Sequence, residues 1–573
     1  MIDLISKAFT QFLSKTDIKV KLEFKNLRKT FSTSVRMQYG DHAHYITSHG
    51  GLSVMDKHYI DKSDVQKKMR KGFKIFVNRN SGAGDLKIIQ LFDALNEMGT
   101  YDEEVLLKKN PAIQKQQLSN LKAHLYRELL TSLRLLKQEE NIDLQLHEQL
   151  DFARILYNKG LYHQSLKILE KIKDLSKANN QVTYLLQALF LEKNIEGLHI
   201  TRSLQDRAEN LAAEVAETNY RLTMIGALSN LSLQLYSWYI KNGLARNKKD
   251  ADLLDQFFNN SVIDASKDAK GFYELMYRYQ CYSWYAFITQ DLIMYYRYCQ
   301  KWVDLFHANP KMIEIETAHY IKGMHNLMGA HFDLRNYQKL AETILAFEAF
   351  SQTPIVLQNH NNHIQVFVYL QIAKLNQHFL QGSFTEGLAD IPFIETKLEE
   401  YELYLDRHRI LVFYYKIASL YFGSGNHEKS IDYLNKIINW KVDLRTDLQC
   451  YARLLHLIAH YELGNLDILD YLLKSVYRFM YKMENLSTVE EAIFSFVKNT
   501  LRLTDREIKT EFKNLLAQLK ELENERFETR AFMYLDIISW LESKINGIPV
   551  ETVVQQKYLE AQKKAMARAQ VTN

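Results

Sequence analysis

Pairs of histidines at helical spacing are the residues of this 573-residue chain that come closest to a metal site. His456 and His460 lie four residues apart, so a helix would place both imidazoles on one face. The zinc-protease pattern needs a glutamate directly after the first histidine, and Leu457 occupies that position. His360 and His363 lie three residues apart in a polar stretch, without an evident third ligand. We therefore predict no metal and no cofactor, and interpret these side chains as packing or surface histidines.

Four more histidines gather within the first sixty residues, where they could approach one another. Imidazole nitrogens are common zinc ligands, so a metal held by this group is the alternative to a purely structural interpretation. These residues are His42, His44, His49 and His58.

A glycine-rich loop at 80–85 (Asn-Ser-Gly-Ala-Gly-Asp) precedes an expected helix and could in principle cradle a phosphate. It lacks the Lys-Ser/Thr ending of a P-loop and does not follow a strand. We interpret it as a helix-entry loop. No Ser/His/Asp or Cys/His arrangement stands out elsewhere, and we expect the protein not to be an enzyme.

Aromatic side chains are dense over 272–287 and again over 295–298. Such rings could form a platform on which the bases of a nucleic acid stack. At helical spacing, however, large rigid rings more often fill the space between helices, because they bury a large area. We favour the packing interpretation.

The elements that position these residues are defined by a recurring phrase: a glycine, one residue, a bulky residue, and usually a small residue three positions later. About a dozen residues with apolar side chains at helical spacing flank each copy, as in a tight turn between two antiparallel helices. Successive turns are 39 to 47 residues apart, except for one gap of 83, which predicts another helical pair between about 181 and 220. Such recurrence predicts an all-α solenoid, with few contacts between residues more than two repeats apart. The turns centre on Gly160, Gly243, Gln290, Arg335, Gly382, Gly425 and Gly464.

Two copies of this phrase resemble the tetratricopeptide repeat (TPR) family. One runs from Phe152 and Ala153 through Gly160 to Ile172, and the other from Ala418 through Gly425 to Ile437. The resemblance covers roughly 150–480, with a period longer than the 34 residues of that family. It implies a TPR-like solenoid whose first helices line a concave, non-catalytic binding surface for a protein or peptide.

The register of the turns assigns seven side chains to first helices and so to the expected protein-binding surface. A competing interpretation is that the large aromatic ones, Phe379, Phe422 and Tyr461, fill the interior of long hairpins. The seven are Asn376, Phe379, Tyr415, Ser419, Phe422, Ile458 and Tyr461.

The chain divides into five expected regions: an irregular basic extension (1–60), an N-terminal helical region (61–142), TPR-like repeats (143–486), capping helices (487–548) and a basic tail (549–573). Residues 1–80 hold 16 Lys or Arg against 7 Asp or Glu, and we expect the segment before residue 61 to be poorly ordered. The alternative function is a nucleic-acid-binding regulator, in which residues 62–137 form a helix-turn-helix-like head around Asn110 and Pro111.

Composition supports a helical, intracellular protein. Only 20 glycines and 5 prolines occur in the chain, which disfavours turn-rich β structure. The three cysteines are far apart and form no CxxC pair, which favours a reducing compartment. No apolar run approaches the roughly 20 residues that span a bilayer, so we expect a cytoplasmic protein without a membrane anchor.

Overall fold

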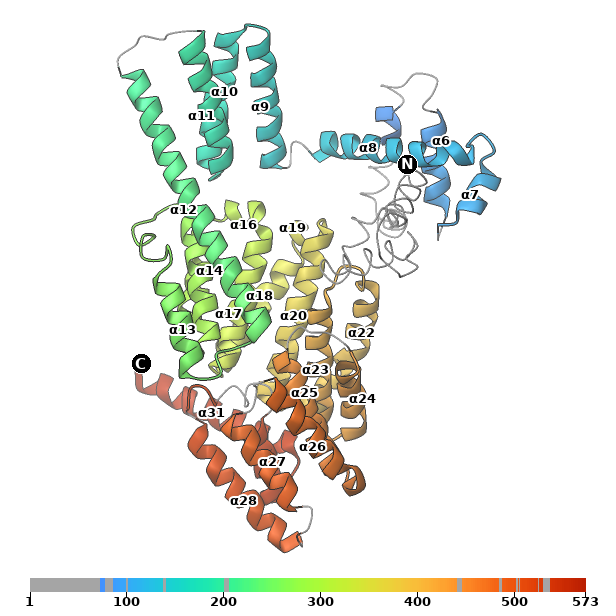
Figure 1. Ribbon diagram of the computed structural model, residues 1–573, viewed down its shortest axis with the longest axis vertical. Helices are drawn as coiled ribbons and strands as arrows, with labels where there is room; N and C mark the ends of the chain where they lie inside the picture. Colours follow the sequence, from blue (N-terminus) through green and yellow to red (C-terminus); the bar gives the residue numbers. More distant parts are fainter. Residues whose placement is uncertain are drawn as a thin grey trace, which may run out of the picture. The chain divides into compact units, whose positions relative to one another are not determined.

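The computed structural model describes eleven segments of the chain, and within them all regular structure is helical (Figure 1). The predictions for the basic extension, for its four histidines and for the loop 80–85 therefore concern residues outside the described segments. The described segments are 73–77, 86–98, 101–137, 141–199, 206–440, 446–483, 487–500, 503, 505–523, 525–528 and 536–572.

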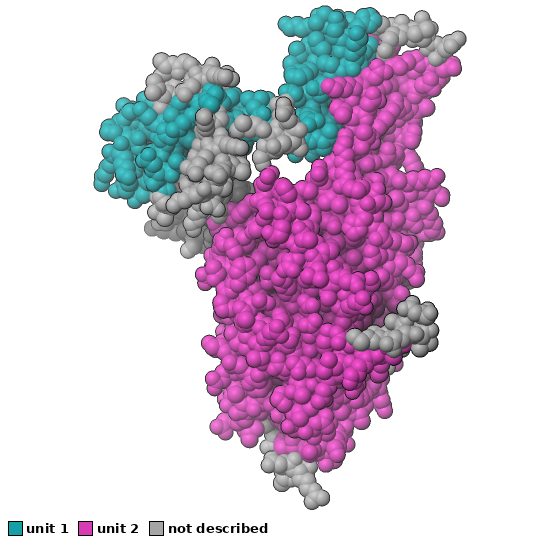
Figure 2. Space-filling model, turned by 180° about the vertical axis from the view of Figure 1, so that it is seen from behind, with its two compact units in different colours: residues 1–168 teal, residues 169–573 magenta. Residues whose placement is uncertain are grey.

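The chain forms two compact units, residues 1–168 and residues 169–573 (Figure 2). The first unit contains a small core built by the helical segment 73–77 together with α6 (Leu86–Glu97), α7 (Glu103–Lys109) and α8 (Lys115–Lys137). Phe73 and Phe92 contact each other in this core, with ring centroids 4.7 Å apart. α9 (Ile142–Asn158) follows, and α10 (Tyr162–Ala178) crosses the boundary between the units.

The second unit is a succession of helices that pack mainly on their neighbours in sequence. α14 packs on α15 and α23 on α24, while α15, α17 and α20 continue the contacts from one pair to the next. The helices are α11 (Val182–Leu198), α12 (Arg207–Asn242), α13 (Lys248–Asn259), α14 (Phe272–Ile288), α15 (Leu292–His307), α16 (Lys311–Ile315), α17 (Thr317–Asp333), α18 (Tyr337–Ser351), α19 (Pro354–Leu357), α20 (His360–Gln381), α21 (Phe384–Gly387), α22 (Ile391–Glu400), α23 (Arg407–Gly423), α24 (His427–Ile438), α25 (Thr446–Glu462), α26 (Leu466–Lys482), α27 (Thr488–Thr500), α28 (Asp505–Leu522), α30 (Ile537–Asn546) and α31 (Val550–Thr572).

All seven turn positions predicted from the sequence have a left-handed backbone. Five are glycines, for which a positive φ costs little, and two are not: Gln290 has φ 60° and Arg335 has φ 52°. An eighth turn of the same kind, which the phrase does not reveal, occurs at Asn180 with φ 57°.

The expected extra hairpin between about 181 and 220 is only partly correct. α11 begins at Val182 as expected, but the following helix, α12, continues for 36 residues to Asn242. α12 contains one glycine, Gly226, and no proline, and one glycine is insufficient to break a helix whose apolar residues pack on α14.

The expectation that distant repeats make few contacts is wrong for the C-terminal helices. α31 packs on α20, more than two repeats earlier in the chain. Glu551 of α31 accepts hydrogen bonds from the backbone N–H of Thr385 (2.9 Å) and from its hydroxyl (2.6 Å). The Arg526 Nε–H donates to the carbonyl oxygen of Thr289 at 2.6 Å. The C-terminal helices therefore fold back on the middle of the array.

Packing explains much of the aromatic density over 272–298. Phe272 contacts Phe306 edge to face at 5.2 Å between ring centroids, and Tyr282 stacks on Tyr298 at 4.2 Å. Phe272 also belongs to the large core of the second unit, which extends from α14 to α31. These rings connect neighbouring helices, as the packing interpretation predicted.

Candidate functional site

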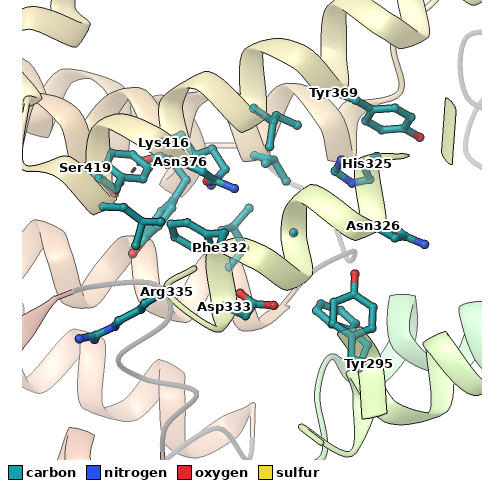
Figure 3. A pocket seen from close by; sticks show the side chains of 18 of the residues that line it. Tyr295, His325, Asn326, Phe332, Asp333, Arg335, Tyr369, Asn376, Lys416 and Ser419 are labelled. Atoms are coloured by element: carbon teal, nitrogen blue, oxygen red, sulfur yellow. Dashed lines mark hydrogen bonds between the residues drawn. The ribbon is translucent and has the colours of Figure 1, made fainter. Parts of the chain in front are cut away.

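A cavity of about 760 Å³ lies within the second unit (Figure 3). Its lining comes largely from α12, α14, α17, α20 and α23, with a contribution from Leu448 of α25. Each of these six helices directly precedes one of the left-handed turns, so each is the first helix of a hairpin. The volume is within the range of roughly 300–1,000 Å³ that ligand pockets occupy.

Five of the seven side chains assigned from the sequence to the binding surface line this cavity. Ser419 and Phe379 are half-buried, whereas the other three are buried. The five are Asn376, Phe379, Tyr415, Ser419 and Phe422.

The remaining two predicted residues lie elsewhere on α25. Ile458 is fully buried in the core. Tyr461 packs against the rings of Phe496 and Trp540, at 6.0 and 6.4 Å between centroids. The cavity therefore does not bring these two together with the other five.

Lys416 is the cation most tightly held in the cavity. Its ammonium donates to Oδ1 of Asn376 at 2.5 Å and lies over the rings of Phe332 (5.8 Å) and Phe379 (5.4 Å). Burial lowers the pKa of Lys416 to about 8, against the opposing attraction of Asp333. Close to neutral pH the side chain is therefore mostly charged, but it loses its proton far more easily than an exposed lysine.

Asp333 supplies the corresponding acidic group at the end of α17. Burial raises the pKa of this carboxyl to about 7, although nearby Lys416 opposes the shift. Asp333 therefore carries its proton in a substantial fraction of molecules at neutral pH. Figure 3 shows it on the same stretch of α17 as Phe332.

Two further cations, Lys322 and Arg409, and the imidazole of His325 surround the buried ring of Tyr369. His325 stacks on this ring with centroids 4.0 Å apart. The Lys322 ammonium lies 5.3 Å from the ring centroid and the Arg409 guanidinium 5.6 Å from it. Arg409 also donates a hydrogen bond of 3.4 Å to the Tyr369 hydroxyl. Cation–π contacts of this kind hold both positive groups at the cavity wall.

Burial and the positive charges of this region both lower the pKa of His325. Burial lowers its pKa well below the usual value, and the charged groups that lower it further are Lys322, Arg409 and Lys416. Since all three are cations, His325 stays neutral at physiological pH.

α31 closes part of the cavity with Val550, Val554 and Lys557. The Lys557 ammonium bonds to Oε2 of Glu542 (2.8 Å) and to the hydroxyl of Ser539 (2.9 Å), both on α30. These contacts hold the Lys557 ammonium against α30.

Sequence reasoning missed the titratable side chains of the cavity: the cations Lys322, Arg409 and Lys416, the neutral His325 and the acid Asp333. One signal was present, because Lys416 is the one charged residue in the largely apolar run over 410–422. A lysine in the middle of a buried helix face requires either a partner or a cavity.

The two histidine pairs that the structure describes are packing residues. The rings of His456 and His460 lie 4.5 Å apart, and burial lowers the pKa of His456 to about 4. His360 and His363 both pack against Tyr401. Across the described segments, no group of three His, Cys, Asp or Glu side chains is placed to hold a metal ion.

Two further expectations concern the whole chain. Within its described part, no helix is long and apolar enough to cross a bilayer. All three cysteines are described; they are buried and form no disulfide.

No protein-family model matches the chain, and no curated protein matches it either.

Proposed function

We propose that the chain is a non-catalytic binding protein, a TPR-like solenoid whose cavity receives a peptide segment of a partner protein. One observation carries the proposal: six first helices, α12, α14, α17, α20, α23 and α25, contribute side chains to one cavity. A surface assembled from the first helix of each stacked hairpin is how repeat proteins form extended binding sites.

The composition of the wall supports a peptide ligand. Aromatic rings such as Trp284, Phe287 and Phe332 provide apolar contact area, while Asn376 and Ser419 provide polar groups that can fix orientation. The buried thiols fit a protein of a reducing compartment.

A peptide selection tests this proposal. A random peptide library is selected against the full chain and then screened against Gly329→Leu, because Gly329 lines the cavity and an added Cβ meets only the Tyr295 hydroxyl at 3.6 Å. Gly226→Leu is the matched control: this glycine also lies inside a helix with open space around it, but outside the cavity lining.

We expect selected peptides to bind the wild type and Gly226→Leu alike and to bind Gly329→Leu at least tenfold more weakly. Peptides that bind all three proteins equally would place recognition outside the cavity and refute the proposal.

A second candidate is the nucleic-acid-binding head. It rests on α7 and α8, the two helices on either side of the turn expected at Asn110 and Pro111. Retention of the full chain on DNA that falls steeply with salt would support it, because phosphate contacts release counterions.

A further inference from the structure

Two cations of the cavity share one aromatic ring and leave their charges facing the same space. Lys322 lies over both Tyr369 (5.3 Å) and Trp284 (5.6 Å), and Arg409 lies over Tyr369 at 5.6 Å. All four side chains line the cavity. Aromatic faces hold a cation in place but do not neutralise it.

Ion pairs neutralise this region only in part, through one salt bridge between Arg409 and Asp406, which also lines the cavity. Among the described residues, no carboxylate forms a salt bridge with Lys322. Arg409 approaches Asp406 at 3.6 Å, but that carboxylate is 57% exposed and also accepts the Arg409 backbone N–H as the cap of α23. Asp333, the buried acid, interacts with Lys416. Lys322 therefore gives the end of the cavity around Tyr369 a positive charge that no salt bridge of the described residues offsets.

Arg335 is an exposed cation that also lines the cavity, at a position where the backbone would favour glycine. It occupies the left-handed position of its turn at φ 52°, which Gly382 and Gly425 occupy in the two following hairpins. A residue other than glycine is strained there, and such strain concentrates at functional sites. The Arg335 side chain lines the cavity, and Figure 3 shows it near the end of α17.

We infer that the cavity binds an organic anion: a carboxylate or similar group, on an aromatic or aliphatic body. Lys322 and Arg409 hold the anionic group beside Tyr369, and the rings of Trp284 and Phe332 contact the body. The inference rests on the proposed function in using the same cavity, and it specifies the chemistry of the ligand. That anion is either an acidic group of a bound peptide or a free organic acid.

Two dyes that share an aromatic body but differ in charge test whether the cavity recognises the anionic group of a ligand or only its shape. 8-Anilinonaphthalene-1-sulfonate carries an anionic group, and N-phenyl-1-naphthylamine lacks it. Both are titrated by fluorescence against the native full chain. We expect a saturable site that binds the anionic dye at least tenfold more tightly than the neutral one. The Gly329→Leu variant should lack this site, and the Gly226→Leu variant should keep it.

The variants Lys322→Gln and Arg409→Gln test whether these two cations bind the anionic group. Each should weaken the anionic dye about tenfold, since hydrogen bonds to charged groups are among the stronger ones, and leave the neutral dye within twofold. Arg407→Gln is the control, because Arg407 is exposed on the same helix and lies outside the cavity lining. Thermal unfolding of each variant establishes that it is folded.

The outcomes separate this inference from the proposed function. Equal affinity of the two dyes, or unchanged anionic binding in both cation variants, overturns the inference and leaves peptide binding to be decided by the selection. Selected peptides whose Asp or Glu residues cannot be replaced by Asn or Gln identify the peptide as the source of the anion. Tight anionic dye binding without any selected peptide supports a free organic acid and refutes the proposed function alone.

Discussion

Gly382 lies directly against the backbone of α31, so that a Cβ at this position would be 2.6 Å from the amide nitrogen of Gln555. The same Cβ would be 2.9 Å from the carbonyl oxygen of Glu551. Gly382 also has φ +67°, so two independent constraints require glycine here. This turn both connects α20 to α21 and seats the C-terminal helix that closes part of the cavity.

Gly382→Ala should therefore detach or displace α31. Its matched control is Gly425→Ala, which shares a positive φ (+84°) but meets no atom within 4 Å. We expect Gly425→Ala to lower the free energy of unfolding by about 1–2 kcal/mol through backbone strain alone. Gly382→Ala should cost more and make 550–572 sensitive to limited proteolysis. Equal stability and equal protease resistance of the two variants would show that the close packing is absent.

Stability should depend on pH through Asp333 and Lys416. Asp333 has a raised pKa of about 7, so between about pH 4 and 7 the folded state binds more protons than the unfolded state, and stability falls as pH rises. Lys416 has a lowered pKa of about 8, so above pH 8 the unfolded state binds more protons, and stability rises with pH. The contribution of the pair is least favourable between pH 7 and 8.

Asp333→Asn should remove the acid-side part of this dependence, which amounts to at most about 1.4 kcal/mol per pH unit. Asp432→Asn serves as control, because Asp432 is 61% exposed on α24. Urea unfolding of the wild type and both variants from pH 4 to 7 measures the effect. A wild-type slope that Asp333→Asn leaves unchanged would assign the proton uptake to other groups.

Alanine variants of Phe422 and Ser419 should show which of these two α23 side chains stabilises the fold and which is available for a ligand. Phe422 is 4% exposed and contacts His427 at 5.0 Å between ring centroids, so Phe422→Ala should cost about 3–5 kcal/mol. Ser419 donates to the Tyr415 carbonyl in its own helix, at 2.9 Å, and Ser419→Ala should cost less than about 1 kcal/mol. Chemical denaturation checks both values, and a Phe422→Ala variant as stable as wild type would restore Phe422 as a pure ligand contact.

Glu462 should be essential for joining α25 to α30. It accepts hydrogen bonds from the Trp540 indole (2.6 Å) and from the Lys544 ammonium (2.7 Å). Glu462→Ala leaves both donors without this acceptor and should cost about 2–4 kcal/mol, whereas Glu462→Gln keeps an acceptor for Trp540 and should cost less. Glu428→Ala, at an exposed position of α24, should be nearly neutral. Differential scanning calorimetry should rank the three variants in this order, and a neutral Glu462→Ala would contradict it.

The hairpins could be predicted because their signals are local. Glycine at the left-handed turn position and apolar residues at helical spacing recur through the chain. Even the turns at Gln290 and Arg335, which lack the glycine, could be placed because the rest of the phrase and its interval remain. The return of α31 onto α20 could not, because Gly382 and Gln555 are far apart in sequence and neither carries a pattern that specifies the other. The same holds for Asp333 and Lys416, which reach one cavity from separate hairpins.

Site-specific photocrosslinking tests the central claim most directly, namely that partners bind inside the cavity. p-Benzoylphenylalanine is placed at Ser419, which lines the cavity, or at Lys474, whose side chain is 61% exposed on α26. With a labelled peptide from the selection, we predict an ultraviolet-dependent adduct from position 419 that excess unlabelled peptide suppresses, and none from position 474. An adduct from position 474 alone would place the binding surface on α26, outside the cavity, and contradict the account.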